Sequence, residues 1–151
     1  MLNGYFAYGS NMNPQRMQQR GLLVLSANGA RLPEHALVFD KIGPERIGAG
    51  HANIVRMPGA EVQGVFYELG HIEEIFKMDP FERAPINYGR DAVQVWVQGR
   101  AQWAWTYFAN PARRRTGLKP TADYLGHLLA GSHFLSTDYC KALRATSCLI
   151  E

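Results

Sequence analysis

The residues best suited to bind a charged group lie in a short loop near the start of the chain, Gly9-Ser10-Asn11. The apolar stretch Tyr5–Ala7 before it predicts a buried strand. Asn13-Pro14 after it predicts a helix start, because Asn caps helices and Pro suits the first helical position. A strand, a turn and a helix start within about ten residues gather backbone N–H groups that attract anions. The same pattern also fits an ordinary strand-to-helix connection.

Glu82 is the carboxylate best suited to acid–base chemistry. It lies in Asp79–Asn87, a proline-containing segment without a clear period between an apolar helix and an apolar strand. Phe81 and Ala84 flank it, and apolar neighbours disfavour an ionised carboxylate, which raises its pKa towards the range of a general base. The alternative is a solvated loop glutamate paired with Arg83.

Three further patterns give weaker grounds for a site. His133 and Cys140 have no orienting partner of the kind a nucleophile pair requires. The basic run 113–115 is too short for nucleic-acid binding and fits a solvated face. The aromatic stripe within Ala101–Ala109 has strand spacing, which favours a core position over a stacking platform.

Length and composition bound the class of protein. A chain of 151 residues predicts a single domain, 1–151, with its own core. A net charge of +3 requires neither nucleic acid nor a membrane as partner. The two cysteines lack metal-site spacing, which favours reduced thiols, no metal and a cytoplasmic location. Neither a signal peptide nor a membrane-spanning run is expected.

The pattern of apolar residues and turn signals predicts an α+β fold. Its mixed, mostly antiparallel sheet is expected to be closed or nearly closed into a small barrel with flanking short helices. A hairpin is expected around Pro58-Gly59. The expected strands are Tyr5–Ala7, Ala27–Arg31, His35–Phe39, Ala52–Met57, Glu61–Leu69, Tyr88–Val97 and Ala101–Ala109. The expected helices are Pro14–Gln19, Ile72–Met78, Thr121–Leu129 and Thr137–Ala145.

Five segments, in order along the chain, resemble conserved parts of one protein family. They are Tyr8–Met12; Gly50–Ile54; Pro58-Gly59 with Val62–Leu69; Met78–Glu82 with Tyr88 and Arg90; and Lys119–Tyr124 with Gly131 and Tyr139. Together they resemble the γ-glutamylcyclotransferase family, which is related to the AIG2-like proteins. One position departs from the pattern, because Arg83 stands where the family often has glycine. The departure is expected to affect the loop or the local charge, and so the substrate more than the chemistry.

The resemblance implies a reaction without enzyme nucleophile, metal or cofactor. The α-amine of a small γ-glutamyl amide or peptide attacks its own γ-carbonyl, closes 5-oxoproline and releases an amine, and the enzyme supplies proximity. Glu82 resembles the catalytic glutamate of the family and would act as general acid and base. The backbone of Gly9, Ser10 and Asn11 would hold the glutamyl carboxylate or the oxyanion.

Three tyrosines resemble those that line the family's pocket: Tyr8, Tyr88 and Tyr124. They would orient Glu82 or the substrate, and simple core packing is the alternative. The resemblance does not identify the amine that is released. The part of the pocket wall that contacts this amine is expected to come from the segments Asp40–Gly50 and Arg113–Pro120. A homodimer is compatible with the sequence, which does not specify an oligomeric state.

Three functions fit this interpretation. The first is a cyclotransferase for γ-glutamyl amino acids or peptides, as in glutathione metabolism. The second is a cyclotransferase for a specialised γ-glutamylated amine or biosynthetic intermediate, although Tyr-Gly-Ser-Asn in place of Tyr-Gly-Thr disfavours the γ-glutamylamine branch. The third is a binding protein without turnover, which the presence of Glu82 disfavours.

Overall fold

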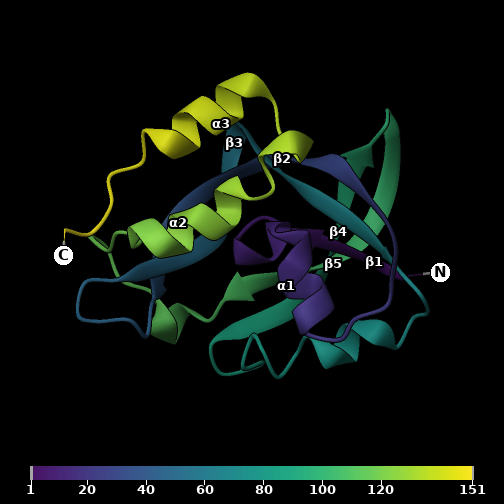
Figure 1. The fold of residues 1–151 in the computed structure, drawn as a ribbon, viewed down its shortest axis with the longest axis horizontal. Coiled ribbons are helices and arrows are strands. Elements are labelled where there is room, and N and C mark those ends of the chain that lie inside the picture. Colours follow the sequence, from purple (N-terminus) through teal and green to yellow (C-terminus); the bar gives the residue numbers. More distant parts are fainter. Residues whose placement is uncertain (1, 151) are drawn as a thin grey trace.

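The computed structural model describes residues 2–150, and within them five strands close into a barrel in the order β1-β3-β2-β4-β5 (Figure 1). All neighbours are antiparallel except β1 and β5, which close the barrel in parallel at Tyr5 and Trp105. The predicted α+β fold with a mixed, mostly antiparallel, closed sheet is therefore confirmed. The strands are β1 (Gly4–Ala7), β2 (Val24–Ile42), β3 (Gly50–Leu69), β4 (Tyr88–Val97) and β5 (Arg100–Ala109).

The predicted hairpin around Pro58-Gly59 is wrong, because β3 runs through this dipeptide as one strand paired with β2. The turn signal becomes an irregularity in the ladder, where Glu34 alone stands opposite 57–60. Gly59 takes a φ of 80° and its N–H donates to the Glu34 carboxylate at 3.1 Å. Pro33 likewise lies inside β2, so the two strand pieces predicted around it form one strand.

The helices lie outside the barrel (Figure 1). Side-chain caps fix their starts. The side-chain Oδ1 of Asn13 accepts from Gln15 N–H, and the Thr121 hydroxyl accepts from Tyr124 N–H. The predicted helices are thereby confirmed, except that the one expected over Ile72–Met78 is a single 3₁₀ turn. The α-helices are α1 (Pro14–Gln19), α2 (Ala122–Leu129) and α3 (Thr137–Arg144), and the 3₁₀ turns are η1 (Ser10–Met12), η2 (Glu74–Lys77), η3 (Pro111–Arg113) and η4 (Ser132–Phe134).

Strand β1 is buried on both faces and anchors the loop that follows it. Tyr5 and Ala7 pack in one core cluster, and Phe6 and Tyr8 pack in a second. Burial of every residue of a four-residue strand fixes its end in position. The loop at residues 9–11 therefore starts from a rigid support.

The aromatic stripe of β5 is only partly core, which corrects the prediction for 101–109. Tyr107 is 3% exposed, whereas Trp103 is 58% exposed. Trp105 is partly buried and lies against the guanidinium of Arg90, 4.3 Å from its ring centroid. Strand periodicity identified the face but not how much of it is covered.

Candidate active site

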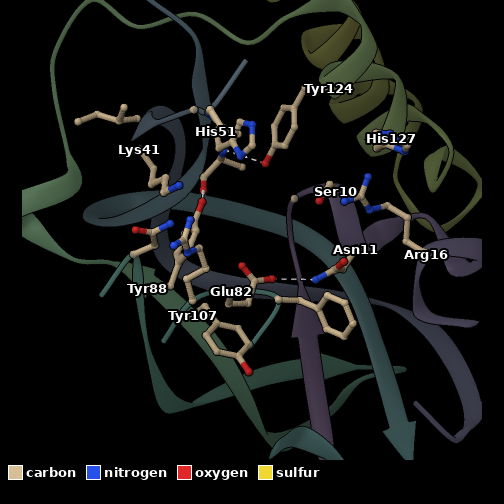
Figure 2. A pocket seen from close by; sticks show the side chains of 18 of the residues that line it. Ser10, Asn11, Arg16, Lys41, His51, Glu82, Tyr88, Tyr107, Tyr124 and His127 are labelled. Atoms are coloured by element: carbon tan, nitrogen blue, oxygen red, sulfur yellow. Dashed lines mark hydrogen bonds between the residues drawn. The ribbon is translucent and has the colours of Figure 1, made fainter. Parts of the chain in front are cut away.

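The structure places all seven predicted site residues around one cavity of about 740 Å³ (Figure 2). They come from four separate parts of the chain: the η1 loop, the turns after η2, the start of β4 and α2. The predicted wall segments also contribute, since Lys41 to Glu45 and Arg113 line the same cavity. The seven residues are Tyr8, Gly9, Ser10, Asn11, Glu82, Tyr88 and Tyr124.

Gly9 begins the loop at a point of close approach. A Cβ atom there would lie 3.1 Å from the Cβ of Ala52 and 3.3 Å from the hydroxyl of Tyr124. The Gly9 carbonyl accepts from Met12 N–H at 3.0 Å, which closes the η1 turn. The first N–H groups of such a turn, here those of Ser10 and Asn11, have no partner within the helix, and both residues line the cavity.

The side chain of Asn11 holds the site together, a role that the sequence analysis missed. Its Nδ2 donates to Tyr5 Oη and to Glu82 Oε1, both at 2.9 Å, and its Oδ1 accepts from Arg20 Nη1 at 2.7 Å. Asn11 is 3% exposed, and Tyr67 Oη donates to its backbone carbonyl at 2.6 Å. Asn11 is thus fixed from both its backbone and its amide.

Glu82 reaches the cavity from a turn, where its N–H donates to the Met78 carbonyl at 3.1 Å. Its side chain is 16% exposed, and Arg20 Nη1 lies 3.9 Å from Oε1. Burial raises the pKa of Glu82, while Arg20 and the hydrogen bond from Asn11 oppose that rise. The cation that pairs with Glu82 is therefore Arg20, and not Arg83 as the solvated alternative assumed.

Arg83 has a φ of 51°, in the left-handed region that favours glycine. The turn therefore adopts a glycine-type conformation although it carries an arginine. The Arg83 side chain also lines the cavity, so the substitution adds a positive charge there. Of the two expected effects, the added charge is therefore seen at the cavity, whereas the backbone keeps a glycine-type conformation.

The three predicted tyrosines line the cavity but do not contact Glu82 by hydrogen bonds within residues 2–150. Tyr8 Oη donates to the Tyr107 carbonyl at 2.6 Å, and Tyr88 Oη donates to the Ala52 carbonyl at 2.8 Å. The hydrogen bond that orients Glu82 comes from Asn11 instead, and the other expected role of the tyrosines, orienting the substrate, stays a prediction.

Tyr124 differs from the other two tyrosines in how its hydroxyl is used. Its Oη accepts from Ala52 N–H at 3.0 Å, which leaves the hydroxyl proton for a ligand. Burial raises its pKa, so the hydroxyl keeps this proton at neutral pH. The His51 ring stacks on Tyr124 with centroids 4.0 Å apart, which fixes the ring plane.

Cationic residues around the cavity were also missed. Arg16 and Arg20 lie four residues apart on and just after α1, a spacing that places side chains on one helix face and could have indicated their joint position. Lys41 lies at the end of β2 within the predicted wall segment, but no local signal distinguished it. The cavity is lined by five cationic residues, Arg16, Arg20, Lys41, Arg83 and Arg113, and by three acidic residues, Glu45, Glu82 and Asp123.

The weaker candidates do not form a site. Cys140 is buried and its Sγ donates to the Ser132 carbonyl at 3.4 Å, while the His133 ring contacts Phe134. Residues 2–150 contain no group of three or more His, Cys, Asp or Glu side chains that could hold a metal ion. Among the helices of the same residues, none has the length and apolarity to cross a membrane.

Solved structures with the same fold include one described as a γ-glutamyl cyclotransferase. It is 26% identical, with a TM-score of 0.81 over 97% of this chain and 88% of that chain. A human protein described as uncharacterised gives the same values. A yeast γ-glutamyl cyclotransferase described as specific to glutathione is 13% identical, with a TM-score of 0.63 over 93% of this chain and 94% of that one, and shows the shared fold.

Among curated proteins, none matches the sequence. The family model "Gamma-glutamyl cyclotransferase, AIG2-like" matches residues 5–126. That range contains β2 to β5, all of β1 except Gly4, and all seven predicted site residues from Tyr8 to Tyr124. The chain belongs to the γ-glutamyl cyclotransferase, AIG2-like family.

Proposed function

We propose that this protein converts a γ-glutamyl amino acid or peptide into 5-oxoproline and a free amine. The observation that carries the proposal is the setting of Glu82. It is a largely buried carboxylate with a raised pKa, held by Asn11 in the cavity that the η1 loop also lines. A group of this kind can accept and return a proton near neutral pH.

The proposed reaction uses one proton carrier. Glu82 removes a proton from the α-ammonium group of the substrate, and the amine nitrogen then attacks the γ-carbonyl carbon. A ring C–N bond forms and the carbonyl oxygen gains negative charge. As that charge returns, Glu82 donates its proton to the leaving nitrogen and the C–N bond to that nitrogen breaks. The regenerated Glu82 carboxylate takes the second proton from the ring nitrogen and passes it to the released amine, which leaves a neutral lactam and an ammonium product. The attacking nitrogen and the carbonyl carbon belong to the same substrate molecule. The contribution of the enzyme is therefore largely to hold the substrate in the conformation in which they meet.

The cavity offers complementary donors for such a substrate. The N–H groups of Ser10 and Asn11 would bind the glutamyl α-carboxylate, and the free proton of Tyr124 would bind the developing oxyanion. Arg16 Nε is buried without a hydrogen-bond partner among residues 2–150, so it would reinforce the carboxylate site. Tyr8 and Tyr88 donate their protons to backbone carbonyls and would shape the wall.

Release of 5-oxoproline from a panel of γ-glutamyl amino acids, peptides (glutathione included) and amines tests the proposal. We expect release by the wild type and a loss of at least about 100-fold in kcat for Glu82→Gln, the scale of general acid–base catalysis. Glu73→Gln is the matched control, because Glu73 is exposed and outside the cavity. Binding of the panel without release by the wild type would instead support a binding protein.

A further inference from the structure

Lys41 is a buried cation without an anionic partner. It is 6% exposed, and no hydrogen bond or ion pair joins its ammonium group to another residue within 2–150. Its Nζ lies 5.4 Å from the ring centroid of Tyr88, and the side chain faces the cavity (Figure 2). Burying an unpaired charge is costly, so a cation in this position is suited to an anion that arrives with a ligand.

The backbone of Lys41 is paired on both sides. Within the ladder it pairs with His51 of β3, and on its other side it forms a bridge to Arg114. The Arg114 side chain forms an ion pair with Asp40, which adds a side-chain contact next to this backbone bridge. The backbone from which the Lys41 side chain extends is therefore set by the barrel rather than by a loop.

The carboxylates around the cavity do not satisfy Lys41. Glu45 contacts His51, and Glu82 is held by Asn11 and Arg20. Burial lowers the pKa of Lys41, and the positive charges of Arg113 and Arg83 act in the same direction, while Glu82 and Glu45 oppose it. The Lys41 side of the cavity thus has an excess of positive charge.

Figure 2 shows Glu82 between the η1 loop on one side and Lys41 with Tyr88 on the other. If the glutamyl carboxylate binds the loop, the α-amine and the scissile amide both lie near Glu82. The leaving group then extends towards Lys41. The unpaired ammonium group consequently faces the part of the substrate that becomes the released amine.

We infer that Lys41 binds a carboxylate of the leaving group, so that the enzyme selects γ-glutamyl amides of amino acids and peptides over amides of amines without a carboxylate. This inference rests on the proposed function and adds the residue that determines specificity. Arg113 lines the same cavity and would add to the attraction. Since Lys41 would act on the leaving group and not on the reacting atoms, its effect should fall mainly on KM.

The test compares γ-glutamylalanine with γ-glutamylethylamide, which differ only by the leaving-group carboxylate. We expect the wild type to prefer the former by about 10- to 100-fold in kcat/KM, the scale of a charge-assisted hydrogen bond. Lys41→Met should remove most of this preference by raising KM for γ-glutamylalanine alone, and Lys41→Arg should retain it. Lys141→Met is the matched control, because Lys141 is exposed on α3 and outside the cavity.

Two outcomes would overturn the inference. One is an equal kcat/KM of the wild type on both amides. This measurement uses the wild type alone and so does not depend on the folding of a variant. The other is an equal loss on both amides in Lys41→Met, which would place Lys41 at the glutamyl group. Absence of release from every substrate would contradict the proposed function instead. Calorimetric affinities of Glu82→Gln for the two amides, with and without Lys41→Met, would then decide the Lys41 inference separately.

Discussion

Asn11 connects two charged residues of the cavity, Glu82 and Arg20, through opposite ends of one amide. Its Nδ2 donates to Glu82 Oε1 at 2.9 Å and its Oδ1 accepts from Arg20 Nη1 at 2.7 Å. Because the two ends differ in character, only one orientation of the amide satisfies both neighbours. Arg20 is thereby kept 3.9 Å from Oε1 rather than forming a bidentate pair. Glu82 Oε2 has no hydrogen bond within residues 2–150 and is left for a proton.

Replacing Asn11 by alanine should move the acid limb of the pH–rate profile to higher pH. The hydrogen bond from Asn11 lowers the pKa of Glu82, so its loss raises that pKa further, and a higher pH is needed to ionise the base. We also expect kcat to fall by about 10- to 100-fold, the scale of a hydrogen bond to a charged group.

The pH dependence of kcat/KM measures this effect, with Asn28→Ala as control, since Asn28 contacts Gln98 away from the cavity. A lower rate with an unshifted acid limb would show that Asn11 contributes to packing and does not affect the pKa of Glu82.

Glu82→Gln should be more stable than the wild type at neutral pH. The folded-state pKa of Glu82 is raised by burial, so the folded state binds its proton more tightly than the unfolded state. The associated stability is fully present below the unfolded pKa of Glu and is lost as pH rises through the folded pKa. Glutamine has no such loss.

Calorimetric Tm values between pH 4 and pH 8 would measure the difference. The Tm advantage of the variant should grow as pH rises and then level off. An advantage that shrinks with rising pH would contradict the raised pKa.

Arg83→Gly should stabilise the protein, and Arg83→Ala should not. Both changes remove the side chain and its charge, but only glycine adopts the φ of 51° without strain. The net gain should stay below about 1 kcal/mol, because glycine also loses more chain entropy on folding. Urea unfolding of the two variants measures the difference, and equal stabilities would show that this backbone is not strained.

Gly64→Ala should disturb the site from outside the cavity. A Cβ at Gly64 would lie 2.3 Å from the carbonyl oxygen of Ala7, so β1 or β3 must shift just before the η1 loop. We expect a loss of about 1–3 kcal/mol in the free energy of unfolding, the usual range for overpacking. Gly89→Ala is the control, because no atom lies within 4 Å of its added Cβ. Equal stabilities of the two variants would contradict the close approach.

Local sequence patterns predicted most elements but not the β2–β3 ladder. Strand β4 begins and ends where alternation and the following turn predicted, at Tyr88 and Val97. Pro58-Gly59 failed as a turn signal. The residues 57–60 form an irregularity in the ladder opposite Glu34, and pairing with β2 resumes on both sides of it. A dipeptide that ends a strand in isolation does not do so when a long neighbouring strand pairs on both sides of it.

For the site, family resemblance brought together residues that no local pattern connects. Glu82 was identifiable from its apolar neighbours, yet its partners were not, because Asn11 and Arg20 lie about 60 to 70 positions earlier in the sequence. Lys41 could not be singled out either. Its significance depends on burial and on the absence of a counter-ion among residues 2–150, both of which arise only in the folded barrel.

The parallel closure of β1 against β5 determines when the site can form during synthesis. The Tyr8 hydroxyl bonds to a carbonyl 99 positions later, and the Thr106 hydroxyl bonds to a carbonyl 100 positions earlier. Contacts this distant in sequence require a large loop to close and are slow to form. A ribosome-bound chain that has exposed the η1 loop therefore carries this loop without its support. The loop would gain that support only once β5 has emerged from the ribosome.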